Sequence, residues 1–300
     1  MRHRFALLVA LASLAFATGA AARDCRRHAL DALRDAPDGA SVYARLSDKT
    51  FFHHWIDCDD PTLGLPTAIH ESVHFITSET DAFPLVGGGD IQRPHEVSQF
   101  YAPSRIAGSF EASEYADTYL KPGRASSSKD FLFLLDELNA YTHDLNAAVD
   151  LKGMRRADRY TDSRDGLAAL MAFVALYVEH ARASEPATWE GLREPAVARA
   201  MATLWGHAEK AMAASCGLPN FGTRDKAFLR QAYGRSAQAA LTGVIGRAPA
   251  TPDECLKASD EDTMDQAEVV EPAPTKRTIW SRRTVRAAPV AANDDEPPNQ

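Results

Sequence analysis

The chain has 300 residues, of which 45% are hydrophobic and 25% charged. This length and composition suffice for one domain with a sizeable core. The formal net charge of −8 at pH 7 argues against a nucleic-acid partner.

Residues 1–22 have the pattern of a secretory signal peptide. The first four residues include two arginines, an apolar run follows from Phe5 to Ala17, and small residues end the segment at Ala22. The apolar run is too short to span a bilayer. We therefore expect cleavage near Ala22 and a secreted or periplasmic protein without stable membrane insertion.

Four cysteines in an exported chain suggest two disulfide bonds. Three pairings are possible. Proximity along the chain favours Cys25 with Cys58 and Cys216 with Cys255.

Apolar and capping patterns predict helices along most of the chain. In order, they cover about Cys25–Leu33, Pro66–Ser78, Ser113–Leu120, Phe131–Leu145, Leu167–Ala183, Trp189–Ser215 and Asp225–Leu241. Three consecutive glycines, Gly87 to Gly89, lie between apolar residues and indicate a hairpin or a flexible loop. We predict a mainly α fold with at most a small β-hairpin or sheet, in one domain over 23–255, followed by a disordered charged tail over 256–300.

The stretch Thr67–Ile76 carries the clearest chemistry in the sequence. His70 and His74 are four residues apart, so in a helix they stand on one face, where both can bind the same metal ion. Glu71 lies beside them, where its carboxylate can take a proton from a zinc-bound water and pass it to a leaving amine. The remaining residues of the stretch are uncharged, as a helix buried beneath a metal site requires.

This H-E-x-x-H arrangement resembles that of the zincins, a class of zinc metallopeptidases. The resemblance implies a Zn²⁺ ion held by His70, His74 and a third protein ligand, with water in the fourth position. Metzincins have glycine and histidine where this chain has Thr77 and Thr80, so that subclass is excluded. The fold implied is a zincin-like helical domain whose small hairpin or sheet lies beside the helix that carries the motif.

Gluzincins take their third ligand from a glutamate on a second helix downstream, and Glu137 matches that role. It lies in the helix predicted from Phe131, whose first turns are apolar on every side. A carboxylate buried there is costly unless a cation such as zinc pairs with it. Tyr141, one turn beyond Glu137, is expected to stabilise the oxyanion of the transition state.

Other residues compete for these roles. Glu79 turns away from the face of the two histidines, so it is a poor third ligand. Asp225 lies in a segment similar to the aspzincin signature, but Phe228 replaces the tyrosine of that signature. Three histidines are alternatives to Tyr141: His143, His180 and His207.

Together these features predict an exported zinc metallopeptidase that hydrolyses peptide bonds in a peptide or protein substrate. Two alternatives stay open: a catalytically inactive zincin-like binding protein of the cell envelope, and a helical envelope protein with an accidental motif. Replacement of Glu71 with glutamine tests the first alternative, and metal analysis tests the second.

Overall fold

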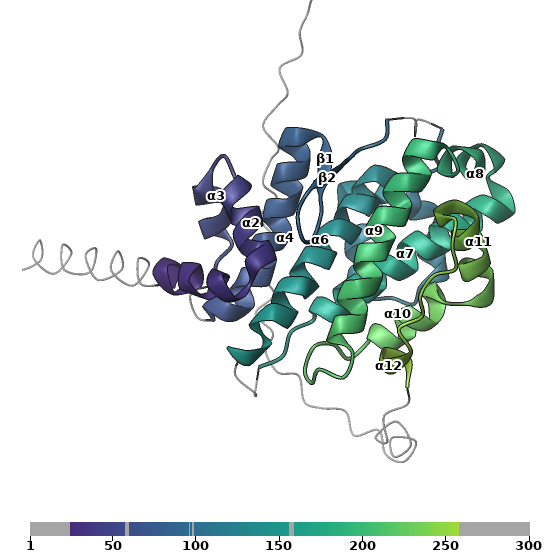
Figure 1. Cartoon of the computed structure of the whole chain (residues 1–300). Helices are drawn as coiled ribbons and strands as arrows, with labels where there is room; N and C mark the ends of the chain where they lie inside the picture. The colour runs from purple at the N-terminus through teal and green to yellow at the C-terminus, as the bar shows by residue number, and fades with distance from the viewer. Residues whose placement is uncertain (1–24, 58–59, 96, 98, 156–158, 258–300) are drawn as a thin grey trace, which may run out of the picture. The chain divides into compact units, whose positions relative to one another are not determined.

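The computed structural model describes residues 25–57, 60–95, 97, 99–155 and 159–257. Helices make up most of these residues, and the described strands form one two-stranded antiparallel sheet (Figure 1). The prediction of a mainly α fold with a small β-hairpin is therefore confirmed. The predicted leader (1–22) and nearly all of the predicted tail (256–300) lie outside the described residues.

Helical residues 25–32 are followed by η1 (Leu33–Asp35), α2 (Pro37–Arg45), α3 (Lys49–His54), α4 (Pro61–Thr80), β1 (Ala82–Pro84), β2 (Asp90–Gln92), η2 (Pro103–Ser109), α5 (Glu114–Tyr119), η3 (Ser126–Ser128), α6 (Phe131–Asp150), η4 (Leu151–Gly153), α7 (Ser163–Ser184), α8 (Pro186–Leu192), α9 (Pro195–Ser215), α10 (Asp225–Ala232), α11 (Arg235–Ile245) and α12 (Asp253–Leu256).

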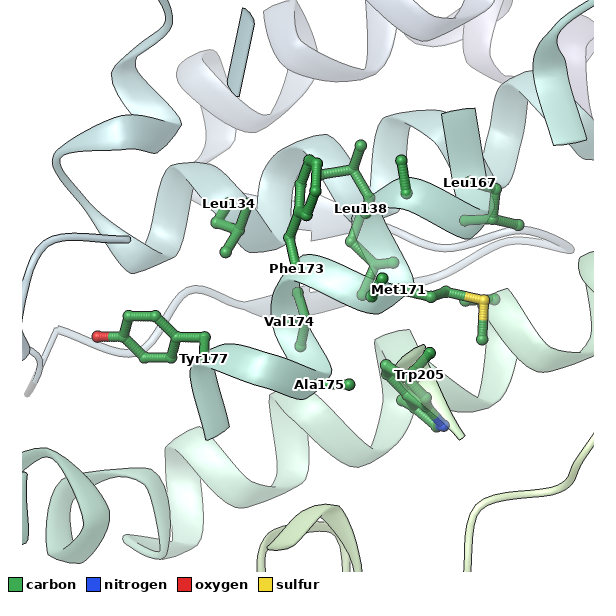
Figure 2. Close-up of a cluster of buried hydrophobic side chains, with 14 of the residues drawn as sticks. Leu134, Leu138, Leu167, Met171, Phe173, Val174, Ala175, Tyr177 and Trp205 are labelled. Atoms are coloured by element: carbon green, nitrogen blue, oxygen red, sulfur yellow. The ribbon is translucent and has the colours of Figure 1, made fainter. Parts of the chain in front are cut away.

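Helix α7 is the central helix of the larger hydrophobic core. Every side chain from Leu167 to Ala175 is buried, as its long apolar opening predicted. Figure 2 shows Leu134 of α6 and Trp205 of α9 among the side chains that surround it. By length and composition α7 could cross a membrane, but most of it is buried inside the fold; no other helix in the described ranges meets this criterion. Its apolar surface is thus used within the core.

Helix α6 separates the two hydrophobic cores and contacts α4, α7 and α9. It begins where the Asp130 side chain accepts a hydrogen bond from the backbone N–H of Leu132, 2.8 Å away, as an N-cap residue does. Leu134 and Leu138 belong to the larger core around α7, whereas Ala140 and Ala147 belong to the smaller core with α4. The middle of α6 therefore faces α4.

The glycine-rich segment is a hairpin in which β1 pairs with β2. Gly87, Gly88 and Gly89 have φ angles of +83°, +101° and +83°, which a residue with a side chain would adopt only under strain. The hairpin is held against α6, because the Pro84 carbonyl accepts hydrogen bonds from Asn139 at 2.8 Å and from His143 at 3.0 Å.

Asp38 of α2 completes this anchor. Its carboxylate accepts hydrogen bonds from the second ring nitrogen of His143 at 2.6 Å and from the backbone N–H of Gly87 at 3.0 Å. Burial alone would raise the pKa of Asp38, but the hydrogen bond and charge of His143 lower it below its ordinary value. The buried pair therefore ties α2, α6 and the hairpin together.

We expect Asp38→Asn to lower the free energy of unfolding by about 2–4 kcal/mol at pH 7, because the substitution leaves the buried His143 without its anionic partner. A carboxyl with a lowered folded-state pKa stabilises the protein above its unfolded pKa, near 4, and loses that effect as pH falls through the folded pKa. The difference between wild type and variant should therefore shrink below about pH 4. Denaturant unfolding at several pH values measures this, with the exposed Glu111→Gln as control.

One predicted helix boundary was wrong at the start of α4. The helix begins at Pro61 rather than Pro66, which lies inside it. Pro66 has no N–H, so the helix lacks one hydrogen bond at this position. The N–H groups of the first turn have no intrahelical partners in any helix, and Pro66 lies shortly after that turn, near the N-terminal end of α4 where few bonds are affected. The proline therefore does not mark the helix start.

Two other predicted helices are each divided in the structure. The predicted helix Trp189–Ser215 is α8 and α9, because Glu194 precedes Pro195 and has a ψ angle of 137°, as the residue before a proline tends to have. The predicted helix Asp225–Leu241 is α10 and α11, separated at Gly234, whose ψ angle is 145°. Periodicity alone did not reveal these breaks, since both sides of each break bury apolar residues.

One of the two predicted disulfide bonds is confirmed. Cys216 and Cys255 are bonded and link the end of α9 to α12. The other predicted pair, Cys25 with Cys58, involves a cysteine that lies outside the described residues.

Candidate metal centre

The two histidines of the motif share one face of α4, as their spacing predicted. The Nε2 atoms of His70 and His74 lie 3.1 Å apart. His70 is buried and His74 is half-buried. Both imidazoles therefore present the same nitrogen toward one point between α4 and α6.

Glu137 of α6 faces that point from the opposite helix. Its Oε2 atom lies 3.6 Å from Nε2 of His70 and 3.4 Å from Nε2 of His74. A position equidistant from these three atoms lies about 2 Å from each, which matches zinc–nitrogen and zinc–oxygen bonds. In the part of the chain that the structure describes, these three residues form the one group of this kind that could hold a metal ion.

The Glu137 oxygen at this position is buried and has no hydrogen-bond partner among the described residues. The Nε2 atoms of both imidazoles lie close to this oxygen, but neither contact has the geometry of a hydrogen bond. Burial alone would raise the pKa of Glu137, but the charge of His74 and the proximity of both histidines lower it well below its ordinary range. A buried carboxylate oxygen beside two imidazole nitrogens is a chemically suitable partner for a metal cation.

Asp136 supports His74 from the other side of its ring. Its Oδ2 atom accepts a hydrogen bond from Nδ1 of His74 at 2.5 Å. When His74 is neutral, this bond puts the proton on Nδ1 and leaves the lone pair of Nε2 for a metal. Burial alone would lower the pKa of His74, but Asp136 and Glu137 raise it well above its ordinary value, so a metal must displace a proton from the metal-free site.

We expect Asp136→Asn to weaken metal binding about 10- to 100-fold, because the residue orients a candidate ligand without contacting the metal. Competition with a chromogenic chelator measures this affinity. Asp117→Asn on α5, at a half-exposed residue that pairs with Lys121, is the control and should leave the affinity unchanged. An unchanged affinity in Asp136→Asn would show that this carboxylate plays no part in metal binding.

Glu71 follows His70 on α4 and is half-buried. Its charge contributes to the raised pKa of Asp144, a buried residue of α6 whose pKa is raised to about 6, mainly by burial. The carboxylate of Glu71 therefore lies close enough to α6 to interact with its acidic groups.

Tyr141 lies beside the centre, packed against His70. The two rings meet edge to face with centroids 4.6 Å apart. The hydroxyl of Tyr141 shares a hydrogen bond of 2.9 Å with the hydroxyl of Tyr119. A Cβ on Gly166 would lie 2.1 Å from the Tyr141 ring, so the glycine allows α7 to approach it this closely.

The rival ligands considered from the sequence are not part of this group. Glu79 is exposed and accepts a hydrogen bond from Ser47 at 2.6 Å. Asp225 is buried and pairs with Arg164 at 2.9 Å. Neither joins the described group of His70, His74 and Glu137.

The rival histidines have other surroundings. Both ring nitrogens of His143 are bonded, to Asp38 and to the Pro84 carbonyl. His180 packs against the ring of Tyr101, with centroids 5.1 Å apart. Burial lowers the pKa of His207, which lies near Asp38 and His143 rather than at the metal centre.

A pocket of about 360 Å³ opens beside the metal centre. His74, Glu137 and Asp136 form one part of its wall. The other lining residues come from the end of α4, from the segment after β2, from η3 and from α6: Thr77, Ser78, Arg93, Ser126, Ser127 and Phe133. The size suits a small ligand or part of a peptide.

Comparison of the chain with protein-family models, with curated proteins and with solved structures finds no match.

Proposed function

We propose that this chain is an exported zinc-dependent hydrolase of zincin type that cleaves peptide bonds. The observation that carries the proposal is the position of Glu137 Oε2, 3.4 and 3.6 Å from the Nε2 atoms of the two motif histidines. Two helices distant in sequence bring together the ligand types that a catalytic zinc uses and place them beside a pocket.

The set of donors favours zinc over other metals. Calcium and magnesium prefer sites made of oxygen atoms, whereas two imidazole nitrogens with one carboxylate oxygen suit zinc. When bound with an open fourth position, zinc lowers the pKa of a water molecule and polarises a carbonyl group. His70, His74 and Glu137 would hold it.

Glu71 is the proposed general base and acid. It accepts one proton from the attacking water and delivers it to the amine nitrogen as the amide C–N bond breaks. The products are a carboxylic acid and an amine, so hydrolysis consumes one water molecule. Its place next to the ligand His70 in α4, half-buried, supports this role.

Tyr141 is the proposed donor to the oxyanion. Burial raises the pKa of Tyr141 well above its ordinary value, so its hydroxyl keeps its proton at neutral pH. The bond between the hydroxyls of Tyr141 and Tyr119 uses only one of their two protons. If Tyr119 donates to Tyr141, the Tyr141 proton is free to stabilise a substrate oxygen.

We expect Tyr141→Phe to lower kcat about 100-fold while one zinc ion per chain is retained, since it removes one oxyanion donor. Tyr119→Phe should have a smaller effect, because that hydroxyl acts through Tyr141. Steady-state kinetics and metal analysis of both variants measure this. If Tyr141→Phe keeps the wild-type kcat, the oxyanion donor lies elsewhere.

The direct test of the function is hydrolysis of a mixed peptide library by the purified protein, followed by mass spectrometry. Cleavage should stop when a chelator removes the metal and return when zinc is added in equimolar amount. If the zinc-loaded protein leaves every peptide intact, the proposed activity is wrong.

A further inference from the structure

Arg93 brings a positive charge to the pocket beside the metal centre. It follows β2 directly and lines the pocket together with His74 and Glu137. Its side chain is only 15% exposed. A guanidinium so far removed from solvent normally has close anionic partners.

Within the described residues, the contacts of Arg93 do not neutralise it in this way. Its carboxylate contact there is Asp81, with 3.7 Å between Nη1 and Oδ1, and Asp81 is half-exposed and also binds His95 at 2.8 Å. The Nε atom of Arg93 is buried and has no hydrogen-bond partner among these residues. The guanidinium therefore keeps bonding capacity for a further anion.

Two aromatic rings hold the guanidinium in place. Its central carbon lies 5.8 Å from the ring centroid of Phe83 and 5.3 Å from that of Phe133. Phe133 is 40% exposed and also lines the pocket. The rings orient the cation and offer an apolar surface beside it, without removing its charge.

A second residue of the pocket also carries an unpaired polar atom. The hydroxyl of Thr77 is buried and makes no hydrogen bond within the part of the chain that the structure describes. Thr77 belongs to α4, one turn after His74, and lines the same pocket. Unpaired polar atoms on residues that line one pocket are available to hydrogen-bond a ligand that binds there.

We propose that Arg93 binds a carboxylate group of the substrate, so that the pocket selects peptides carrying a carboxylate close to the bond at the metal centre. This proposal rests on the proposed function for its link to hydrolysis. The carboxylate is either the C-terminus of the peptide or an acidic side chain, since both offer the two oxygens that the guanidinium fork takes.

The test measures binding to the Glu71→Gln protein with equimolar zinc, so that no probe is consumed. The probes are three N-acetylated alanine tetrapeptides: one with a free C-terminus, one with a C-terminal amide, and one amidated with an internal aspartate. Calorimetry should show the free-acid or the aspartate peptide binding at least about 10-fold tighter than the neutral amide, and the tighter of the two identifies the source of the carboxylate.

Substitutions then assign the preference to Arg93. In Arg93→Gln the ratio of affinities should fall to near 1, and in Arg93→Lys it should be intermediate, because the charge stays but the fork is lost. Arg105→Gln is the matched control, since Arg105 also lies over a ring, that of Tyr101, and pairs with an acid, Glu185, outside the pocket. It should keep the full preference.

The results separate this proposal from the proposed function. Equal binding of the three peptides, no binding of any of them, or a preference that survives in Arg93→Gln overturns the carboxylate site. A preference that depends on Arg93, in a protein whose wild type hydrolyses no peptide, supports the carboxylate site and overturns the hydrolase instead.

Discussion

Glu71→Gln should abolish hydrolysis while zinc stays bound at one ion per chain. Glutamine has nearly the shape of glutamate but cannot accept the proton of the attacking water, and general acid–base catalysis by one group contributes about 10²- to 10⁴-fold. Because Glu71 is half-buried and is not one of the three proposed ligands, the fold and the metal affinity should be preserved. Peptide hydrolysis and metal content, measured on the same preparation, test this.

The control for this variant is Glu79→Gln, on the same helix but exposed and bonded to Ser47. It should keep both activity and zinc. Wild-type activity in Glu71→Gln would show that the proton acceptor is another group. An unchanged cellular phenotype in this variant, with zinc bound, would favour the zincin-like binding protein.

Glu137→Ala should have the largest effect on the metal. It removes the only carboxylate among the three proposed ligands, so we expect zinc affinity to fall by more than the 10- to 100-fold that loss of a supporting residue costs. Zinc that binds only the folded state stabilises the protein by an amount that grows with the logarithm of the zinc concentration divided by Kd. The rise in Tm on addition of zinc should therefore be present in the wild type and absent in Glu137→Ala.

Asp150→Ala is the control for this experiment, because it removes a carboxylate from the last residue of the same helix. It should show the same zinc-dependent rise in Tm as the wild type. A full zinc response in Glu137→Ala would mean that the third ligand is another residue.

The histidine pair could be predicted because it depends on local geometry alone. Residues four apart stand on one face of any α-helix, so His70 and His74 come together whatever surrounds α4. Glu137 depends on a contact between two helices, which no local rule specifies. Its burial in an apolar helix was the physical signal, and the structure brings it to the two histidines.

Asp136 was missed, although it is the residue next to Glu137. Adjacent residues of a helix point about 100° apart, so helical periodicity does not predict that Asp136 and Glu137 reach the same site. In the structure His74 lies between them, with one ring nitrogen toward each carboxylate. Two consecutive acids in an otherwise apolar helix were the signal that could have identified both.

Arg93 had no sequence signal, since it follows a short strand in a segment without helical or strand periodicity. Its place beside Phe133 comes from the hairpin packing against α4 and α6. That packing depends on Asn139 and His143 binding one carbonyl of the hairpin, that of Pro84. Such a contact is specific to the tertiary structure.

X-ray absorption spectroscopy at the zinc edge, on wild-type protein loaded with one equivalent of zinc, determines whether His70, His74 and Glu137 hold the metal. We expect two imidazole nitrogens and at least one carboxylate oxygen at about 2.0–2.2 Å, with the imidazole signal lost in a His70→Ala and His74→Ala double variant. A protein that binds no stoichiometric zinc, or a zinc ion without imidazole ligands, would rule out this metal centre.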